Sequence, residues 1–418
     1  MIAPSTLKRA PWLRRWGWLA AAAAASGILA CVIVAVRAES SSDFRDYWET
    51  ARHFRQTGEI TDQLGVHNYL PFFTVLMVPW SLLPLRIAIV IFTLVSLGLF
   101  TLAVVMAETL LCDGLPRRPR PALLAALGLM LAYVYSCTVL GAVGLLVTFL
   151  IVATWFLFER GREWPAGVAL GLATLIKLLP GLLIIFFLLQ RRWRVAAGAA
   201  GVVLLFGLGL PLLSLGPRQA CHEHEAFYRR AVEQHSAWAT VAGERPHKIH
   251  YRNSALPAVL RRLLTHTNST PDDRGTQLFV NFANLPSTAV FAGYVALLAA
   301  ILGASVFAAR RSRPDAHDPR TLRVPFGIWC CAMLLASPLL WIHYLPMAYW
   351  PVALLTDGLE RTRRAEHRLD RPTLLILALW LGGVFLLAWP AARAAGAQLA
   401  ALLALWLLLT SHALRRLR

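Results

Sequence analysis

The sequence predicts an all-α, polytopic integral membrane protein. Hydrophobic residues make up 57% of the 418-residue chain and charged residues only 15%, which is outside the usual range of soluble globular proteins. Apolar runs that reach the roughly 20 residues needed for a membrane span recur from one end of the chain to the other. We therefore expect a single multi-spanning domain over residues 1–418, with about 10 to 12 transmembrane helices.

The net charge of +19 comes from clusters of Lys and Arg that lie between the apolar runs. Such clusters are typical of the cytoplasmic loops of membrane proteins, and we expect no nucleic-acid partner. The basic residues before the apolar run at 16–36 resemble those of a signal peptide. That run is too long for a typical cleaved segment, so we predict an uncleaved first span that starts inside the cell.

This orientation places two long polar segments outside, at residues 37–68 and 216–285, together with the turn around His343. The proline-rich run at 69–84 is better explained by an interfacial or re-entrant helix than by a full span. Residues 165–190 have basic flanks on both sides, yet they are too short for two crossings. Two half-helices that meet near Lys177 satisfy both facts, which predicts a broken or re-entrant pair. Four polar elements, distant in sequence, would then converge on one face of the membrane.

Asp43 is the first candidate for chemistry, because it lies close after the first apolar run. Asp43, Tyr47 and Ala51 recur every four residues and so share one face of a predicted helix. An acid held where a membrane segment meets water can act as a base on lipid-borne substrates. The alternative is that Asp43 is simply the N-cap of this helix. Asp46, three residues further on, is the substitute base.

Lys177 is the least expected residue, because it lies inside an apolar segment. A lysine in such a place costs free energy unless its amine reaches water or meets an anion. Pro180 helps to break the helix and frees backbone carbonyl groups nearby. We therefore interpret Lys177 as a phosphate-binding residue, with an amine that reaches towards water as the alternative.

Two further segments supply polar and aromatic side chains. Trp341 and His343 lie in a short turn between apolar runs, where the alternative is membership of the aromatic belt at the membrane interface. Arg252 and Asn253 suit the recognition of phosphate and hydroxyl groups, whereas a helix start capped by Asn253 or Ser254 is the structural alternative.

No pattern of metal ligands or paired cysteines is evident. The six cysteines lie mostly in predicted spans and form no disulfide framework. His222 and His224 are two residues apart and do not share a helix face, and spacing places no third ligand near them. We predict no metal and no cofactor.

In their order along the chain these motifs resemble glycosyltransferase family 87, multi-spanning enzymes of the GT-C class that use polyprenyl-phosphate sugars. The resemblance runs through most of the chain and rests on Asp43-Phe44 with Tyr47 and Ala51, Gly58, Tyr69-Leu70-Pro71-Phe72, the Pro79 to Pro84 stretch, Ile176-Lys177 to Pro180, Asn253-Ser254 with Arg262, and Ser337-Pro338 with Trp341 and His343. The family often has a Gly-Gln and an Asn in the turn before the fourth span, where this chain has Gly141-Ala142-Val143-Gly144.

The resemblance implies a GT-C fold and an enzyme of the bacterial inner (plasma) membrane. It would transfer a hexose from a polyprenyl-phosphate sugar to a lipid or glycan acceptor on the external, periplasmic face. Mannose is favoured, and arabinofuranose, glucose or another pentose are the alternatives. Asp43 would be the general base, with inversion at the anomeric carbon. Lys177 and His343 would hold the donor phosphate. The residues expected to contact the substrate are Tyr47, Arg252, Asn253 and Trp341.

The competing class is a transporter or flippase that moves lipid-linked sugars without reacting them. Transporters often carry repeated halves with broken helices in matching positions. This sequence shows one broken segment and no second copy, which favours the transferase.

Overall fold

The computed structural model is all-helical across the residues that it describes, which confirms the predicted class. These are residues 25–36 in part, 42–60, 69–112, 114, 120–233, 236–271, 275–311, 318–366 and 371–415. Most of the predicted first span at 16–36, and the basic residues Arg117, Arg118 and Arg313, lie outside the described residues.

Six helical segments are long and apolar enough to cross a membrane, as expected for a multi-pass membrane protein. They are α4 (Leu85–Leu111), α5 (Pro121–Leu140), the continuous segment of α9 (Trp193–Leu204), η4 (Leu205–Gly209) and α10 (Leu210–Leu215), α15 (Ser287–Arg311), α18 (Arg371–Phe385) with η8 (Leu386–Ala388), and α20 (Ala397–Arg415). Six is fewer than the predicted total of about 10 to 12, because several apolar runs in the described part of the chain form shorter helices.

Shorter helices pack among these six segments. They are α3 (Pro71–Met77), η3 (Val78–Leu82), α6 (Gly144–Glu159), α7 (Glu163–Ile176), α8 (Gly181–Leu189), α16 (Arg323–Leu335) and α17 (Tyr349–Glu366). Every residue of α16 from position 325 to 335 is buried. Small residues let α7 and α9 approach closely: a Cβ added to Gly167 would lie 2.9 Å from the Cα of Gly198.

The predicted break at Lys177 is confirmed. α7 ends at Ile176, and Lys177 has an extended backbone with φ −142° and ψ 130°. α8 begins at Gly181, directly after Pro180. The break puts Lys177 at one end of α7, and Arg160 and Arg162 lie at the other.

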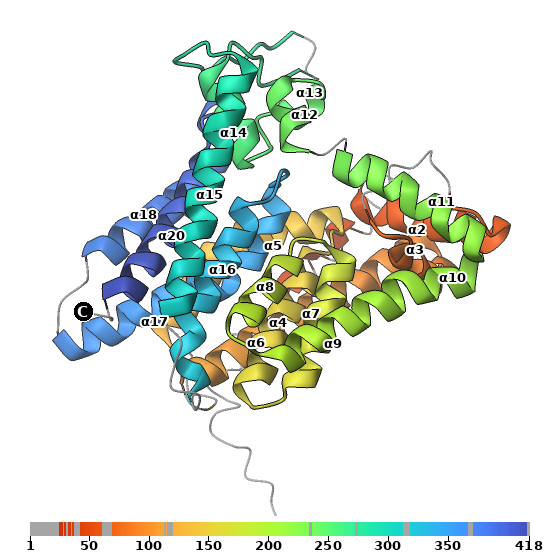
Figure 1. Cartoon of the computed structure of the whole chain (residues 1–418), viewed down its shortest axis with the longest axis horizontal. Helices are drawn as coiled ribbons and strands as arrows, with labels where there is room; N and C mark the ends of the chain where they lie inside the picture. The colour runs from red at the N-terminus through yellow and green to blue at the C-terminus, as the bar shows by residue number, and fades with distance from the viewer. Residues whose placement is uncertain are drawn as a thin grey trace, which may run out of the picture.

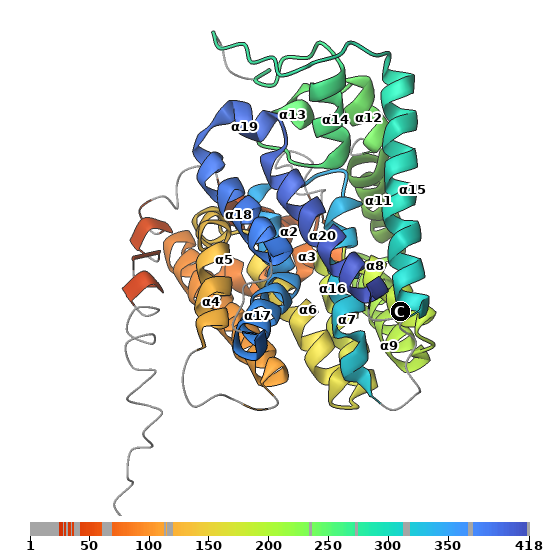
Figure 2. The same cartoon turned by 90° about the vertical axis from the view of Figure 1, so that its left-hand side faces the viewer.

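The predicted polar segment 216–285 folds into short helices at one end of the bundle. These are α11 (Pro217–Phe227), η5 (Tyr228–Glu233), α12 (Ala237–Ala242), α13 (Pro246–Ile249) and α14 (Leu256–Leu264). Figure 2 shows α12, α13 and α14 beside the upper end of α15, together with α19 (Pro390–Ala394). Figure 1 shows α11 over α10 on the other side of the molecule, close to α2 (Asp43–Thr57) and α3.

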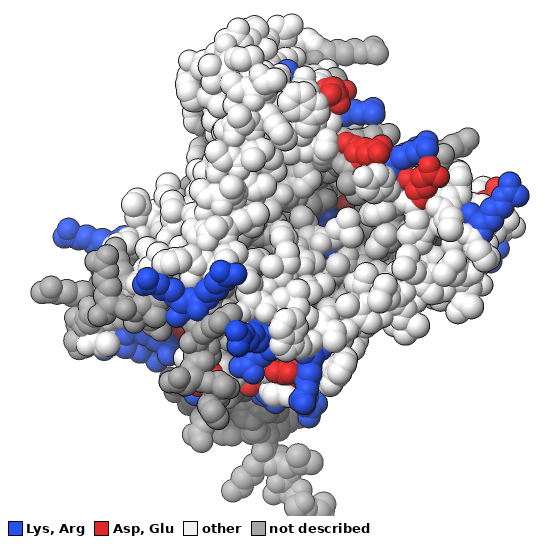
Figure 3. Space-filling model, in the orientation of Figure 1, with Lys and Arg blue, Asp and Glu red and all other residues white. Residues whose placement is uncertain are grey.

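Arginines mark the opposite end of the bundle. On the face drawn in Figure 3, Lys and Arg gather along the lower edge, where Figure 1 places the turns between α6 and α7 and between α8 and α9. The arginines of these turns are Arg160, Arg162, Arg191, Arg192 and Arg194. Because η7 (Ile342–Ala348) precedes α17, and Arg361 to Arg364 lie near its far end, His343 also lies away from the arginines.

Candidate active site

Asp43 is the first residue of α2 and is not its N-cap. The cap is Ser42, whose hydroxyl oxygen accepts a hydrogen bond from the backbone N–H of Arg45 at 3.3 Å. The capping alternative for Asp43 is therefore wrong, although a carboxylate in the first turn is still favoured by the helix dipole. Tyr47 and Ala51 are buried on the same face of α2, as the spacing of four predicts. The Asp43 side chain is therefore not needed to cap α2.

Asp43 faces His343, which comes from a segment 300 residues away in the sequence. The Nε2 atom of His343 lies 3.8 Å from Oδ2 of Asp43, with 13% and 33% of the two side chains exposed. This distance is longer than a direct hydrogen bond, yet catalytic contacts often tighten only when substrate binds. Tyr47 adds a hydrogen bond to the Asp43 carboxylate. The carboxylate is thus oriented by groups from two elements while part of it stays open.

Lys177 supplies a positive charge near Asp43, and its amine lies against two aromatic rings. Its Nζ atom lies 3.3 Å from the ring centroid of Tyr344 and 5.9 Å from that of Tyr69, in cation–π geometry. The hydroxyl of Tyr69 is 2.7 Å from that of Tyr47, so the tyrosines connect the Lys177 end of the site to Asp43. The sequence correctly predicts that the elements of Asp43, Lys177 and His343 converge. Tyr69 and Tyr344 were not among the predicted site residues.

The environment of the site changes the protonation of two groups. Burial raises the pKa of Asp43 from 3.8 to about 6, and nearby Asp46 adds to this, whereas Lys177 and the hydrogen bond from Tyr47 oppose it. Burial, assisted by Lys177, lowers the pKa of His343 to about 3. His343 is therefore neutral near pH 7, so its predicted role towards phosphate would depend on a hydrogen bond rather than on positive charge. A base with a pKa near neutrality suits proton abstraction.

The turn between α5 and α6 packs against both Phe44 and His343 and so helps to fix the positions of Asp43 and His343 relative to each other. Gly141 has φ 63°, and a Cβ there would lie 2.5 Å from Cβ of Phe44, the neighbour of Asp43. A Cβ added to Gly144 would overlap the carbonyl oxygen of His343 and lie 3.0 Å from Sγ of Cys137. Only glycine fits at either contact without displacement of its neighbours. This is the turn in which the chain departs from the common family pattern.

Replacing Gly144 by Ala should therefore slow the proposed sugar transfer by about 10²-fold, because an error of about 1 Å between reacting groups has an effect of that order. Gly128→Ala is the matched control, since a Cβ at Gly128 in α5 meets nothing within 4 Å and Ala favours helix over Gly. The measurements are the transfer rate and the thermal unfolding midpoint of both purified variants. Equal activity of the two variants would contradict the role given to this turn.

Asn253 lies inside the protein, where its side chain links two segments by hydrogen bonds. It is fully buried; its amide nitrogen donates to the carbonyl of Lys248 at 2.8 Å, and its oxygen accepts from the N–H groups of Ala255 and Leu340, both at 3.0 Å. Asn253 thus fastens the α13–α14 connection to the turn that precedes His343. That substrate contacts this residue directly stays a prediction, and the observed bonds favour a positioning role.

Arg262 completes this junction from inside the protein. The guanidinium is fully buried and donates to the carbonyls of Ile249, His250, Asn253 and Ala394. Arg252, in contrast, is exposed and lies against Tyr251, with its Nε 3.4 Å from the tyrosine hydroxyl. Trp341 is half-buried directly before η7. The structure therefore brings Asp43, Tyr47, Lys177 and His343 together, while Arg252 makes no described bond to any of them.

Metal chemistry has no evident set of ligands in this part of the molecule. No group of three or more His, Cys, Asp or Glu residues lies together among the described residues. The described site combines the carboxylate of Asp43, the imidazole of His343, the amine of Lys177 and tyrosine hydroxyl groups.

Residues 67–338 match the family model of glycosyltransferase family 87. The chain belongs to this family. The matched region includes Lys177 and the Gly141 to Gly144 turn, and it ends before His343. Asp43 lies ahead of it. The resemblance noted in the sequence is therefore confirmed at the level of the family.

Two curated relatives are similar to part of this family 87 protein. They are the alpha-(1->3)-arabinofuranosyltransferases of Mycobacterium tuberculosis strains CDC 1551 / Oshkosh and H37Rv, each 28% identical over 227 residues. The match covers 51% of this chain and 50% of each relative, so it spans about half the length of those proteins. Among solved structures, ArnT from Cupriavidus metallidurans bound to undecaprenyl phosphate aligns with 95% of this chain and 77% of its own, at 13% identity and a TM-score of 0.45.

Proposed function

We propose that this family 87 protein transfers a sugar from a polyprenyl-phosphate donor to a hydroxyl group of a lipid or glycan acceptor. The observation that carries the proposal is the approach of Asp43 to His343, with Lys177 held close by on aromatic rings. A base and a phosphate-binding cation are the two groups that such a reaction needs most. Membership of glycosyltransferase family 87 supports the same reaction class.

The chemistry requires only one titrating carboxylate. The acceptor oxygen bonds to the anomeric carbon while the bond from that carbon to the phosphate oxygen breaks. The acceptor proton moves to Asp43, and the electron pair of the broken bond leaves with the polyprenyl phosphate. Because phosphate is a good leaving group, no general acid is needed to protonate it. A single displacement of this kind inverts the anomeric centre.

Lys177 and His343 have distinct roles in this proposal. The ammonium group of Lys177 stabilises the negative charge that grows on the leaving phosphate, which is the electrostatic effect that commonly contributes most to catalysis. Neutral His343 orients the carboxylate of Asp43 through its Nε2 atom. Tyr47 supports the carboxylate from α2. The site lies at the end of the bundle away from the arginines, which supports the external face.

The sugar is the least constrained part of the reaction. The sequence resemblance favours a hexose, and mannose in particular, whereas the two Mycobacterium relatives are named for arabinofuranose. We therefore propose arabinofuranose as the first donor sugar to test, with mannose as the second. In the test below, both sugars are supplied as polyprenyl-phosphate donors.

The test is a transfer assay with the purified full-length protein and a lipid acceptor. Polyprenyl-phosphate arabinofuranose, polyprenyl-phosphate mannose and a nucleotide sugar would be supplied separately, and products identified by mass. We expect a pentosylated or hexosylated product only from the lipid-linked donors. Transfer from the nucleotide sugar alone would contradict the donor class, and a hexosylated product alone would exclude arabinofuranose.

The raised pKa of Asp43 predicts the pH dependence of transfer. The base is active when deprotonated, so kcat/KM should fall about tenfold for each unit of pH below about 6 and level off above about 7. The Lys177 side chain lowers the pKa of Asp43. Removing this lysine should therefore raise that pKa and move the fall in kcat/KM to higher pH. The measurement is kcat/KM between about pH 5 and pH 8. A flat profile down to pH 5 would mean that Asp43 keeps the ordinary value of 3.8 or is not the base.

A further inference from the structure

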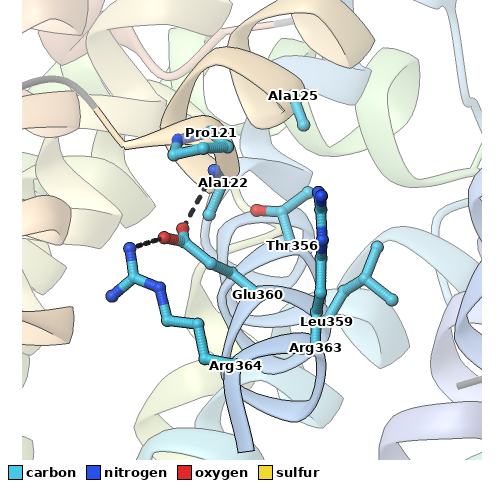
Figure 4. Close-up of a pocket in the computed structure, with 8 residues that line it drawn as sticks. All are labelled: Pro121, Ala122, Ala125, Thr356, Leu359, Glu360, Arg363 and Arg364. Atoms are coloured by element: carbon cyan, nitrogen blue, oxygen red, sulfur yellow. Dashed lines mark hydrogen bonds and ion pairs between the residues drawn. The ribbon is translucent and has the colours of Figure 1, made fainter. Parts of the chain in front are cut away.

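A cavity of about 540 Å³ lies far from the proposed active site, at the arginine-rich end of the protein. It is formed between the first turns of α5 and the second half of α17, and Figure 4 shows the residues that line it. Ala122, Ala125 and Leu359 give it an apolar side, and Glu360, Arg363 and Arg364 give it a charged side. α17 begins directly after η7, so this cavity and His343 lie at opposite ends of one helix.

Among the described residues, three of the four arginines around the cavity are paired with carboxylates. Three buried carboxylates from α4 and α17 are bound by three arginines: Glu108 and Asp357 by Arg120 at 3.0 and 2.7 Å, Asp357 also by Arg361 at 2.7 Å, and Glu360 by Arg364. Glu360 also accepts a hydrogen bond from the backbone N–H of Ala122 at 3.1 Å. The fourth arginine, Arg363, has no carboxylate partner among the described residues. Within the described part of the chain, these four arginines therefore outnumber the three carboxylates by one positive charge.

The unpaired arginine points into the cavity. In Figure 4 the side chain of Arg363 extends along α17 towards Thr356, beside Leu359. This direction follows from helix geometry, because side chains lean towards the N-terminus of their helix. Arg363 is exposed, so its guanidinium is open to a ligand that enters the cavity from the membrane surface. The apolar side chains beside it would contact the hydrocarbon part of such a ligand.

We propose that this cavity binds the phosphate of an anionic phospholipid from the leaflet at the arginine-rich end. α5 is a candidate membrane span and begins at Pro121, which lines the cavity, so the cavity lies at the level expected for head groups. The planar guanidinium of Arg363 suits two hydrogen bonds to one phosphate. Ala125 and Leu359 would contact the glycerol and the first acyl carbons. A free phosphate ion would gain nothing from these apolar side chains.

The test measures lipid retention by the purified full-length protein. After partial removal of lipid, the protein would be incubated with phosphatidylglycerol, phosphatidylcholine or inorganic phosphate, and bound lipid would be counted by native mass spectrometry. Arg363→Gln removes the unpaired charge. Arg194→Gln is the matched control, because Arg194 is also exposed at the basic end of a candidate span, and it does not line the cavity.

We expect phosphatidylglycerol to bind more tightly than phosphatidylcholine and Arg363→Gln to weaken its binding about fivefold to tenfold. Arg194→Gln should leave it nearly unchanged, and thermal unfolding of the exposed-site variants should confirm that both fold. Equal loss in the two variants would show general surface attraction and overturn the proposal. Equal binding of the two lipids would also overturn it. So would binding of inorganic phosphate that is as tight as the binding of phosphatidylglycerol. Sugar transfer by these variants is a separate measurement, so failure here leaves the proposed reaction untouched.

Discussion

Replacing Asp43 by Asn should reduce sugar transfer by about 10²- to 10⁴-fold, the usual contribution of a general base. The amide keeps the shape of the carboxylate but takes no proton from an acceptor hydroxyl. Expression, folding and donor binding should stay close to those of the wild type, because Ser42 caps α2 and the Asp43 side chain is not needed for the helix. Turnover of a polyprenyl-phosphate sugar with the purified variant is the measurement.

Asp46→Asn is the internal control for this variant. Asp46 lies in the same first turn of α2, yet it is off the face shared by Asp43, Tyr47 and Ala51. It faces neither His343 nor Lys177 in any described contact, and we expect less than about a tenfold loss. An inactive Asp46 variant beside an active Asp43 variant would show that the base is misassigned. Full activity of both variants would contradict a carboxylate base in α2.

Replacing Lys177 by Met should lower kcat/KM for the donor by about 10²-fold, the typical effect of removing one electrostatic stabiliser of a transition state. The apparent KM for the acceptor should change little, because in the proposed reaction Lys177 acts on the donor phosphate. Steady-state kinetics with each substrate varied in turn separate the two effects.

Tyr344→Phe is the matched control for Lys177→Met. It keeps the ring 3.3 Å from the Lys177 amine and removes only the hydroxyl, so donor kinetics should stay within about threefold of the wild type. Near-normal donor kinetics in a well-folded Lys177→Met protein would instead favour the interpretation that this lysine merely reaches towards water.

Several features of the fold could be predicted because they follow from the pattern of hydrophobic and charged residues alone. Composition predicts helices in a membrane, and the paired basic flanks of an apolar run too short for two crossings predict the break at Lys177. Helical spacing places Asp43 and Tyr47 on one face. These features depend on nearby residues in the sequence, which is why one chain suffices to predict them.

Other features depend on contacts between distant segments and could not be predicted. Asn253 looks like a polar loop residue in the sequence, but the fold buries it against the turn before His343. The neutral state of His343 depends on how deeply that turn is buried. The need for glycine at 144 arises from the carbonyl group of His343, almost 200 residues later. The only signal in the sequence was a pair of glycines in one turn.

The most direct test of the central claim follows a labelled sugar in proteoliposomes that contain the purified protein. Labelled polyprenyl-phosphate sugar and a lipid acceptor would be added, and both the product and the position of unreacted donor measured. We predict that the wild type forms a glycosylated acceptor with inverted anomeric configuration and that Asp43→Asn forms it at least about 10²-fold more slowly. Donor that crosses the bilayer unchanged, with no product in either protein, would contradict the account and identify a transporter of lipid-linked sugars.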